Sequence, residues 1–436
     1  MISSTMFPEN FRYLLVTHIP FSRQNGQIVT DGLWLRDLEQ LIAHAGPVRI
    51  AAPDHTGLPL QTWGPSTGVV PSDLPVSFVS LPRMRSPRDF FSAHRIKTIL
   101  SKEAEWADLV HTSHCFHPYT VLYHAHHTAV RLGKKTLFVI AEDFNDIQTW
   151  EWIRPAVKGV TFWRRTWALH SLIRRVKACI QTASLTFLHT PAAVARYRLY
   201  AKNAMAIRQP IHSVQDIITG TQFMHKCLNI TSGEPLRLIS ACRHVSIKGL
   251  DFAIRAIHQL TQKGISVEAH FFGKGPQTET LQKLIAHYGL QDRVFLPGAL
   301  PSGTAVYEEI GKSHLFLMLH RTTDFGRGFF DAMTGATPVI AFHTSASAHT
   351  VRDQQDGVLV PLDDVESLAA AIQKLHENRS ELCRLSEGAL LRAKQNTREN
   401  WFGWRCEWIG ELFVDDARFA TSCPISPVQM ITKNRD

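Results

Sequence analysis

The stretch LRLISACRHVSIKGLDFAIRAI, residues 236–257, decides the fold class. Its first six residues form a mostly apolar run, and its last eight place apolar side chains at helical spacing. Between them lies a short loop that carries two cations, Arg243 and Lys248. A strand, a loop and a helix in this order are typical of a parallel α/β sheet.

Short apolar runs of the same kind recur along the chain, from RYLLVTHI at 12–19 to GVLVP at 357–361. Helical patterns lie between them, as in GLWLRDLEQLIAHAG at 32–46. This alternation predicts an α/β fold of two doubly wound, Rossmann-like domains that face a central cleft. In such sheets ligands bind outside the carboxyl ends of the strands, so we expect the site in that cleft.

The domain boundaries follow from where the alternation weakens. We expect an N-terminal domain over 1–209 and a C-terminal domain over 236–395. Residues 210–235 contain no clear strand and are predicted to be the linker. Three tryptophans at helical spacing in NTRENWFGWRCEWIGELF predict a helix within 396–419 that carries a buried stripe. The tail, 420–436, is predicted to be poorly ordered.

Size and composition exclude several classes of protein. With 436 residues, 44% hydrophobic and 19% charged, the chain is too long for a single small binding module. Its seven cysteines are scattered and never form a CxxC pair, which argues against a disulfide framework or a zinc cluster. We find neither a secretory leader nor an apolar run of about eighteen residues. We therefore expect a cytoplasmic protein.

The net charge of +9 is concentrated in one segment. No Asp or Glu occurs from Trp152 to Gln215, whereas eleven Arg and Lys residues do. Within residues 158–180 aromatic side chains alternate with these cations, a pattern that could lie on an anionic membrane, on the inner face. The alternative is a helix with an apolar core face and solvated arginines. No nucleic acid is expected, because no DNA-binding or RNA-binding motif accompanies the charge.

Three groups of residues in the second half could bind a ligand. Arg243 and Lys248 follow a strand and precede a helix, and two cations in this position could bind a phosphate or diphosphate. A solvated loop with a surface Arg and Lys would show the same pattern. Gly273 and Gly275 in FFGKGP predict a tight turn that a ligand could approach closely, or a plain turn between strand and helix.

The third group is HRTTDFGRGFFDAM, residues 320–333. Gly326, Arg327 and Gly328 would form a loop with free backbone N–H groups at the start of a helix. Asp331, in the first turn, could accept hydrogen bonds from sugar hydroxyls. Alternatively Asp331 complements the helix dipole and Asp324 caps the turn.

Taken in order, the second half resembles the nucleotide-sugar domain of glycosyltransferase family 4. The resemblance rests on ACRHVSIKG, FFGKGP, LQDRVFLPGAL, DFGRGFFDAMTGATPVIAF and DGVLVPLDDVESLAAAI, and it covers residues 236–375, with the first domain similar only in outline. That family has the GT-B fold, retains anomeric configuration and transfers sugar without a bound metal. The resemblance implies the same for this chain, with the donor bound by the C-terminal domain and the acceptor presented by the N-terminal domain. It also implies that the helix within 396–419 returns to the first domain.

The resemblance also implies roles for single residues. Arg243 and Lys248 match the basic pair that holds the donor diphosphate, and Asp331 matches the carboxylate that binds the ribose. The remaining donor-side positions match the glycine turn beside the nucleobase and the loop that faces the pyrophosphate; they are Gly273, Gly275 and Gly326.

One departure from the family pattern concerns catalysis. The first glutamate of the family, which contacts the transferred sugar, falls at Thr323, and the nearest acid is Asp324 one position later. Asp324 could serve after a loop shift of one residue, the sugar contact could differ, or activity could be lost. Arg327 stands where the family has an apolar residue and could add a cation for the leaving diphosphate.

The first half offers further candidates at strand ends. Asp143 could stand in for the missing glutamate, and Glu142 beside it could bind an acceptor hydroxyl; solvated acids are the alternative. One of His111 and His114 could face the cleft, with His111 taken as a catalytic candidate, but their spacing is poor for a metal.

A glycine loop near the first strand is the last candidate. Asn25 and Gly26 could bring backbone N–H groups towards the donor phosphate or the acceptor. The paired glycine usual in the family is absent, so an ordinary loop is the stronger interpretation.

Together these patterns predict a retaining, metal-independent glycosyltransferase without a cofactor. It would move a sugar from a nucleotide-diphosphate sugar to a hydroxyl of a glycan, a lipid-linked glycan or a small molecule, in polysaccharide or glycoconjugate biosynthesis. Two alternatives stay open: a catalytically silent GT-B protein that binds nucleotide sugar or a partner, which Thr323 suggests, and a nucleotide-sugar epimerase, whose additional acids we cannot place.

Overall fold

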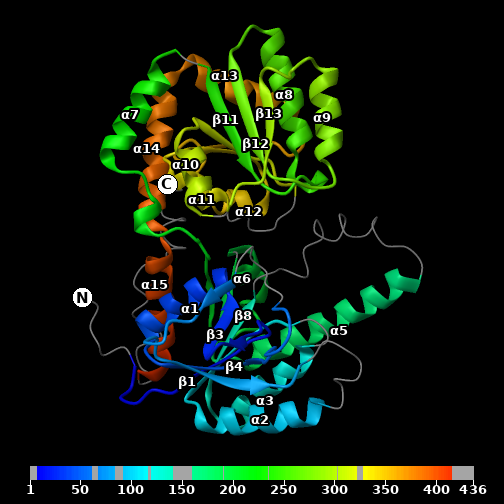
Figure 1. Cartoon of the computed structure of the whole chain (residues 1–436), viewed down its shortest axis with the longest axis vertical. Helices are drawn as coiled ribbons and strands as arrows, with labels where there is room; N and C mark the ends of the chain where they lie inside the picture. Colours follow the sequence, from blue (N-terminus) through cyan, green and yellow to red (C-terminus); the bar gives the residue numbers. More distant parts are fainter. Residues whose placement is uncertain are drawn as a thin grey trace. The chain divides into compact units, whose positions relative to one another are not determined.

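The computed structural model describes residues 7–60, 67–83, 92–115, 119–140, 160–189, 191–233, 235–301, 303–321 and 328–414. These residues form two compact units (Figure 1). The described residues before Gln209 and after Asn400 make the first unit, and those from Gln209 to Asn400 make the second. None of the described helices is long and apolar enough to cross a membrane.

The first unit is built on a parallel sheet of seven strands in the order β10-β9-β8-β7-β1-β4-β6. The strand β1, which lies between β7 and β4, reads YLLV, and all four of its residues are buried, as expected for a strand covered on both faces. The strands are β1 (Tyr13–Val16), β4 (Val48–Pro53), β6 (Val76–Leu81), β7 (Leu109–Ser113), β8 (Lys135–Ile140), β9 (Leu185–Leu188) and β10 (Ala204–Ala206). The helices are α1 (Gly32–Ala45), α2 (Ala93–Trp106), α3 (Tyr123–Arg131), α5 (Val160–Thr182) and α6 (Pro191–Tyr197).

A small antiparallel sheet, which the sequence did not predict, also belongs to the first unit. It consists of β2 (Ser22–Gln24), β3 (Gln27–Asp31) and β5 (Thr67–Val69). Asp31 is the last residue of β3 and the N-cap of α1. Its carboxylate accepts hydrogen bonds from the backbone N–H groups of Leu33 and Trp34, both at 3.0 Å.

The last helix, α15 (Arg398–Gly410), packs against the first unit through its tryptophans. Trp401 and Trp408 are buried in the cluster that contains Tyr13 of β1, and Trp404 is partly buried against it. The ring of Trp408 meets that of Phe187 at a centroid distance of 5.9 Å. The stripe of tryptophans is therefore core.

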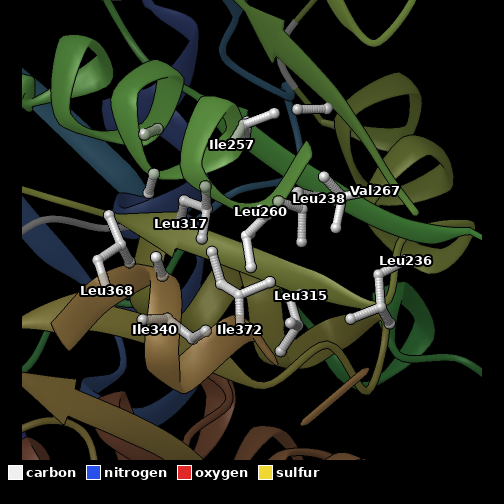
Figure 2. Packing of buried hydrophobic residues seen from close by; sticks show 14 of the residues in the cluster. Leu236, Leu238, Ile257, Leu260, Val267, Leu315, Leu317, Ile340, Leu368 and Ile372 are labelled. Atoms are coloured by element: carbon white, nitrogen blue, oxygen red, sulfur yellow. The ribbon is translucent and has the colours of Figure 1, made fainter. Parts of the chain in front are cut away.

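The second unit has a parallel sheet of six strands in the order β13-β12-β11-β14-β15-β16. Leucines and isoleucines of its strands and of α8 and α13 fill the core between them (Figure 2). The strands are β11 (Leu236–Ala241), β12 (Val267–Phe272), β13 (Val294–Gly298), β14 (Leu315–Met318), β15 (Val339–Phe342) and β16 (Gly357–Val360). The helices are α7 (Gly220–Thr231), α8 (Leu250–Gln262), α9 (Thr278–His287), α10 (Thr304–Gly311), α11 (Gly328–Thr334), α12 (Ser345–Ala348), α13 (Val365–Glu377) and α14 (Arg379–Gln395). Two parallel α/β units confirm the predicted fold class.

The described residues of the predicted linker, 210–233 and 235, group with the second unit and include α7. The helix starts with a capping box between Thr219 and Gln222. Lys226 on α7 is buried, and its ammonium donates to backbone oxygens of Ser313 at 2.5 Å and Gly335 at 2.7 Å. A polar residue of α7 is thus part of the core, and the spacing of apolar residues in the sequence could not predict this.

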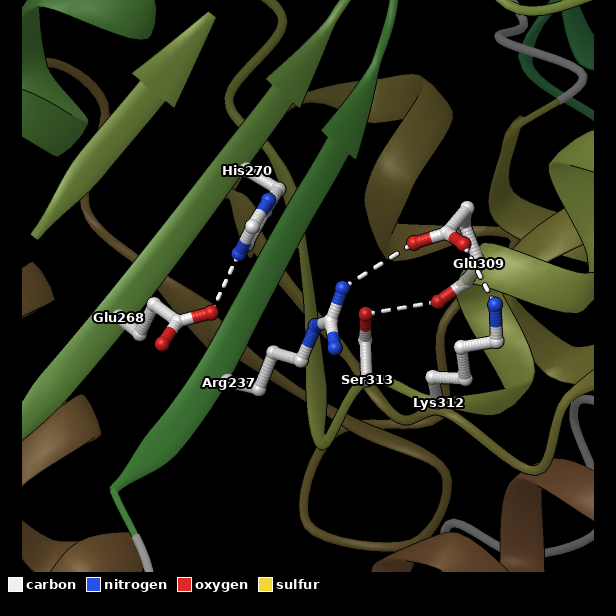
Figure 3. Close-up of polar contacts among 6 residues, drawn as sticks. All are labelled: Arg237, Glu268, His270, Glu309, Lys312 and Ser313. Atoms are coloured by element: carbon white, nitrogen blue, oxygen red, sulfur yellow. Dashed lines mark hydrogen bonds and ion pairs between the residues drawn. The ribbon is translucent and has the colours of Figure 1, made fainter. Parts of the chain in front are cut away.

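A polar network ties β11 to α10 near the amino end of the strand (Figure 3). Arg237 donates to Glu309 at 3.1 Å, and Glu309 also accepts from Lys312 at 2.7 Å. Arg237 and Arg243 therefore place two cations at opposite ends of one strand.

Candidate functional site

Three loops meet at the carboxyl edge of the sheet in the second unit. They follow β11, β12 and β14, and β11 pairs with both other strands. The backbone N–H of His244 donates to Lys274 at 3.2 Å, which joins the first loop to the second. The N–H of Arg321 donates to Ile247 at 2.9 Å, which joins the first loop to the third.

Glycines allow these loops to approach so closely. A Cβ on Gly273, where φ is +137°, would lie 1.9 Å from the carbonyl oxygen of Cys242. A Cβ on Gly275 would lie 2.3 Å from that of His244. The predicted turn is present, and contact with the chain's own backbone is sufficient to require both glycines. Their predicted role beside a nucleobase stays a prediction.

Arg243 and His244 are neighbours in the sequence, but Arg243 faces solvent and His244 lies in the core. His244 is buried, its Nδ1 lies 3.0 Å from the hydroxyl of Thr278, and burial lowers its pKa. That hydroxyl also accepts from the N–H of Gly275 at 3.0 Å. Arg243 is exposed, and its side chain makes no hydrogen bond or ion pair with any residue that the structure describes. A guanidinium held on a braced loop and open to solvent can bind an anion.

Lys248 is held by a histidine that the sequence analysis missed. Lys248 ends a short 3₁₀ turn, and its Nζ lies 3.2 Å from Nδ1 of His320. Only 7% of His320 is exposed, and burial, together with the charge of Lys248, lowers its pKa to about 3. The imidazole is therefore neutral, accepts at Nδ1 and carries its proton on Nε2. A histidine directly after an apolar strand at this edge was the signal available.

The Nε2 atom of His320 is buried and has no hydrogen-bond partner among the described residues. Arg321, next in the chain, pairs with the carboxylate of Asp363. Its guanidinium carbon lies 5.2 Å from the ring centroid of Phe252. Arg321 also lines a surface pocket of about 410 Å³ between α8 and α9, beside Ser246 and Arg255. This edge of the sheet is thus rich in cations.

Gly328 and Asp331 lie on α11, the helix that follows β14. Gly328 begins the helix, where a Cβ would lie 3.3 Å from Cε of Met318. Asp331 is half-buried in the first turn, as predicted, and its backbone oxygen accepts from the hydroxyl of Thr334 at 2.7 Å. Six predicted positions lie outside the described residues: Glu142, Asp143, Thr323, Asp324, Gly326 and Arg327.

In the first unit Asn25 and Gly26 form the turn between β2 and β3. Their φ angles are +50° and +79°, as a two-residue hairpin of this kind requires, and both residues are exposed. The pair therefore belongs to a hairpin of the small sheet. The turn geometry explains both residue types without a ligand.

His111 lies within β7, in the sheet of the first unit. Its Nδ1 is 2.8 Å from the hydroxyl of Tyr13, and burial, aided by the charge of Arg405, lowers its pKa to about 3. An imidazole of this kind is a weak base at neutral pH. The observed contact of His111 is its hydrogen bond with Tyr13, and the catalytic role stays a prediction.

His114 follows β7 at the carboxyl edge of the sheet, and His18 follows the neighbouring strand β1. Burial lowers the pKa of His114 to about 4, and His18 acts on it electrostatically. His18 is a second residue that the sequence analysis missed. These two imidazoles stand where an α/β sheet presents its ligand site.

The second unit also resembles known proteins in its sequence. Residues 228–392 match the family model of glycosyl transferases group 1. The chain is 32% identical over 158 residues to the putative colanic acid biosynthesis glycosyltransferase WcaL of Salmonella typhimurium. The aligned region covers 35% of this chain and 38% of that protein. The chain thus spans less than half the length of this curated relative.

Two solved structures resemble nearly the whole chain. Sucrose-phosphate synthase from Thermosynechococcus elongatus aligns with a TM-score of 0.62 at 16% identity, over 93% of this chain and 98% of that one. Anabaena HepE in complex with UDP aligns with a TM-score of 0.62 at 14% identity, over 92% and 99%. The chain has the GT-B fold, and its second unit is similar in sequence to glycosyl transferases group 1.

Proposed function

We propose that the chain is a retaining glycosyltransferase whose second unit binds a nucleotide-diphosphate sugar. The observation that carries the proposal is that Arg243 and Lys248 both lie on the loop after β11, at the carboxyl edge of the sheet, where the loops after β12 and β14 are joined to it. Both cations lie within residues 228–392, the stretch that matches glycosyl transferases group 1. The structure of HepE with UDP, a protein of the same fold, supports a nucleoside diphosphate as the ligand.

The two cations would stabilise the charge that develops on the leaving diphosphate. Arg243 is open to solvent and can form two parallel hydrogen bonds to phosphate oxygens. Lys248, fixed by His320, supplies a point charge that needs little reorganisation when the sugar bond breaks. The acceptor hydroxyl would attack from the face that the diphosphate leaves, which retains the anomeric configuration. These residues supply the positive charge without a metal or a cofactor.

The acid that steadies the anomeric carbon is proposed to be Asp324, with Asp143 as the second candidate. Asp331 would bind the donor ribose. The acceptor is proposed to be a hydroxyl of a glycan or a lipid-linked glycan, in polysaccharide or glycoconjugate biosynthesis. The names of relatives that serve colanic acid and amylovoran biosynthesis support this class of acceptor.

Incubation with a panel of nucleotide sugars tests the reaction. We expect one donor to be consumed, with release of its nucleoside diphosphate, and proton NMR of the product should show the anomeric configuration of the donor. An inverted product would contradict retention. Tight binding without transfer or hydrolysis would favour the catalytically silent alternative, and an exchanged sugar configuration without transfer would favour an epimerase.

A further inference from the structure

One side of α5 carries a continuous stripe of large aromatic and basic side chains. Steps of four, three, four and three residues join Trp163, Trp167, His170, Arg174 and Lys177, which places them on one face of the helix. The side chains of Trp163 and Trp167 are 71% and 73% exposed. In Figure 1 this helix extends past the sheet of the first unit.

The opposite face of α5 is core. Leu172, Val176 and Ile180 are buried in the cluster that also holds Phe138 of β8 and Tyr197 of α6. The helix is therefore anchored to the first unit by its second half. Its exposed stripe cannot turn inward without breaking this cluster, so the two tryptophans face solvent in the folded unit.

The stripe continues onto the turn after α6. Nζ of Lys177 lies 3.9 Å from the ring centroid of Tyr200, which joins the helix to that turn. Leu199 is 83% exposed and Tyr200 is 41% exposed. We call the whole set the α5 surface: Trp163, Trp167, Arg174, Lys177, Arg198, Leu199 and Tyr200.

No charge of the opposite sign is near in the sequence. The chain has no Asp or Glu from Trp152 to Gln215, so the α5 surface combines apolar rings with cations only. Indole rings prefer the boundary between lipid headgroups and acyl chains, and Arg and Lys pair with the phosphates above it. We propose that the α5 surface binds an anionic lipid bilayer, with Trp163 and Trp167 at that boundary.

Two other occupants fit less well. A second copy of this surface would bring cations against cations, which repel. A nucleic acid would pair with Arg174 and Arg198, but Leu199, the most exposed of the large apolar residues here, would gain nothing from phosphates or bases. The proposal is independent of the transfer reaction proposed above, and the test below measures binding alone.

Flotation of the full chain with vesicles of phosphatidylcholine, with and without phosphatidylglycerol, tests the proposal. We expect binding to the anionic vesicles that weakens as salt rises. Each cation removed near the surface should lower the partition coefficient about fivefold, so Arg174→Gln with Arg198→Gln should bind much more weakly. Arg95→Gln with Lys97→Gln, which removes two exposed cations from α2, is the matched control and should bind as the wild type does.

The tryptophans have their own readout. Brominated phosphatidylcholine in the anionic vesicles should quench the fluorescence of the wild type, and Trp163→Ala with Trp167→Ala should remove most of this quenching and weaken binding. The control is Met224→Ala with Leu228→Ala, a pair on α7 with the same spacing and 68% and 65% exposure. Equal binding to neutral vesicles, unchanged quenching in the tryptophan variant, or binding to short duplex DNA but not to vesicles would overturn the proposal.

Discussion

Nζ of Lys248 lies 3.2 Å from Nδ1 of His320, so a cation after β11 is fixed by a neutral imidazole after β14. The pair joins two loops that are 72 residues apart in the sequence. Its position at the carboxyl edge of the sheet makes it part of the proposed diphosphate site.

The first prediction concerns this contact. His320→Ala removes the acceptor that fixes Lys248, and because hydrogen bonds to charged groups contribute about 1.5–3 kcal/mol, nucleotide affinity should fall at least about tenfold. His320→Asn can still accept through its side-chain oxygen and should stay within about threefold of the wild type. Isothermal titration calorimetry with the best-bound nucleoside diphosphate measures both. An alanine variant that binds as tightly as the wild type would contradict the positioning role.

The second prediction concerns the packing of the loops. Gly273→Ala places a Cβ 1.9 Å from the oxygen of Cys242, so the loops must separate. We expect a loss of about 3 kcal/mol or more in unfolding free energy, and weaker nucleotide binding. Gly289→Ala is the control, because φ is also positive there, at +65°, but nothing lies within 4 Å of the added Cβ. The Gly289→Ala variant should lose only about 1 kcal/mol of unfolding free energy and bind nucleotide as the wild type does. Denaturant unfolding compares the two.

The third prediction concerns Lys226. Its ammonium donates to Ser313, Gly335 and Thr337, and Lys226→Met would remove this donor from three buried oxygens. We expect a loss of about 3 kcal/mol or more at neutral pH. Lys283→Met, at a lysine side chain that is 75% exposed, should be nearly neutral.

The same lysine should make stability depend on pH. Burial lowers the pKa of Lys226 from 10.5 to about 7. Between these values the unfolded chain binds more protons than the folded one, so the free energy of unfolding should rise as pH increases from about 7 to about 10. Lys226→Met should lack this rise, and a variant that keeps it in full would show that another group is responsible.

The fourth prediction concerns the buried histidines. Burial lowers the pKa of His314 to about 4, and its Nδ1 accepts from the backbone N–H of Arg237 at 3.1 Å. The folded state therefore binds fewer protons than the unfolded chain between about pH 4 and 6.5, and stability should fall as pH drops through this range. His314→Asn keeps an acceptor and should reduce the slope by up to about 1.4 kcal/mol per pH unit. Unfolding curves at a series of pH values measure the slope.

The sequence predicted the parallel α/β architecture because strands buried on both faces are continuous apolar runs, as YLLV in β1 shows. The placement of Arg243, Lys248 and Asp331 at one sheet edge followed from their positions after strands. Residues held by short local geometry were therefore accessible to sequence reasoning.

Features that depend on distant partners were not accessible. The strand β2 reads SRQ with two exposed residues, so its pairing with β3 leaves no apolar pattern. The helix α7 buries a lysine whose oxygen partners lie 87 and 109 residues away, so the sequence analysis did not predict this helix. His320 was missed for the same reason, because its significance lies in its contact with Lys248.

A thermal-shift panel of nucleotide sugars on the wild type, Arg243→Ala and Arg237→Gln tests most directly whether the second unit binds a donor. A donor at about a hundred times its dissociation constant should stabilise the wild type by about 2.7 kcal/mol, a rise of several degrees in Tm. Arg237→Gln removes a cation from the other end of the same strand and should keep this rise, whereas Arg243→Ala should lose most of it. A wild type that no nucleotide sugar stabilises, or an Arg243→Ala variant that responds as fully as the wild type, would contradict the proposed site.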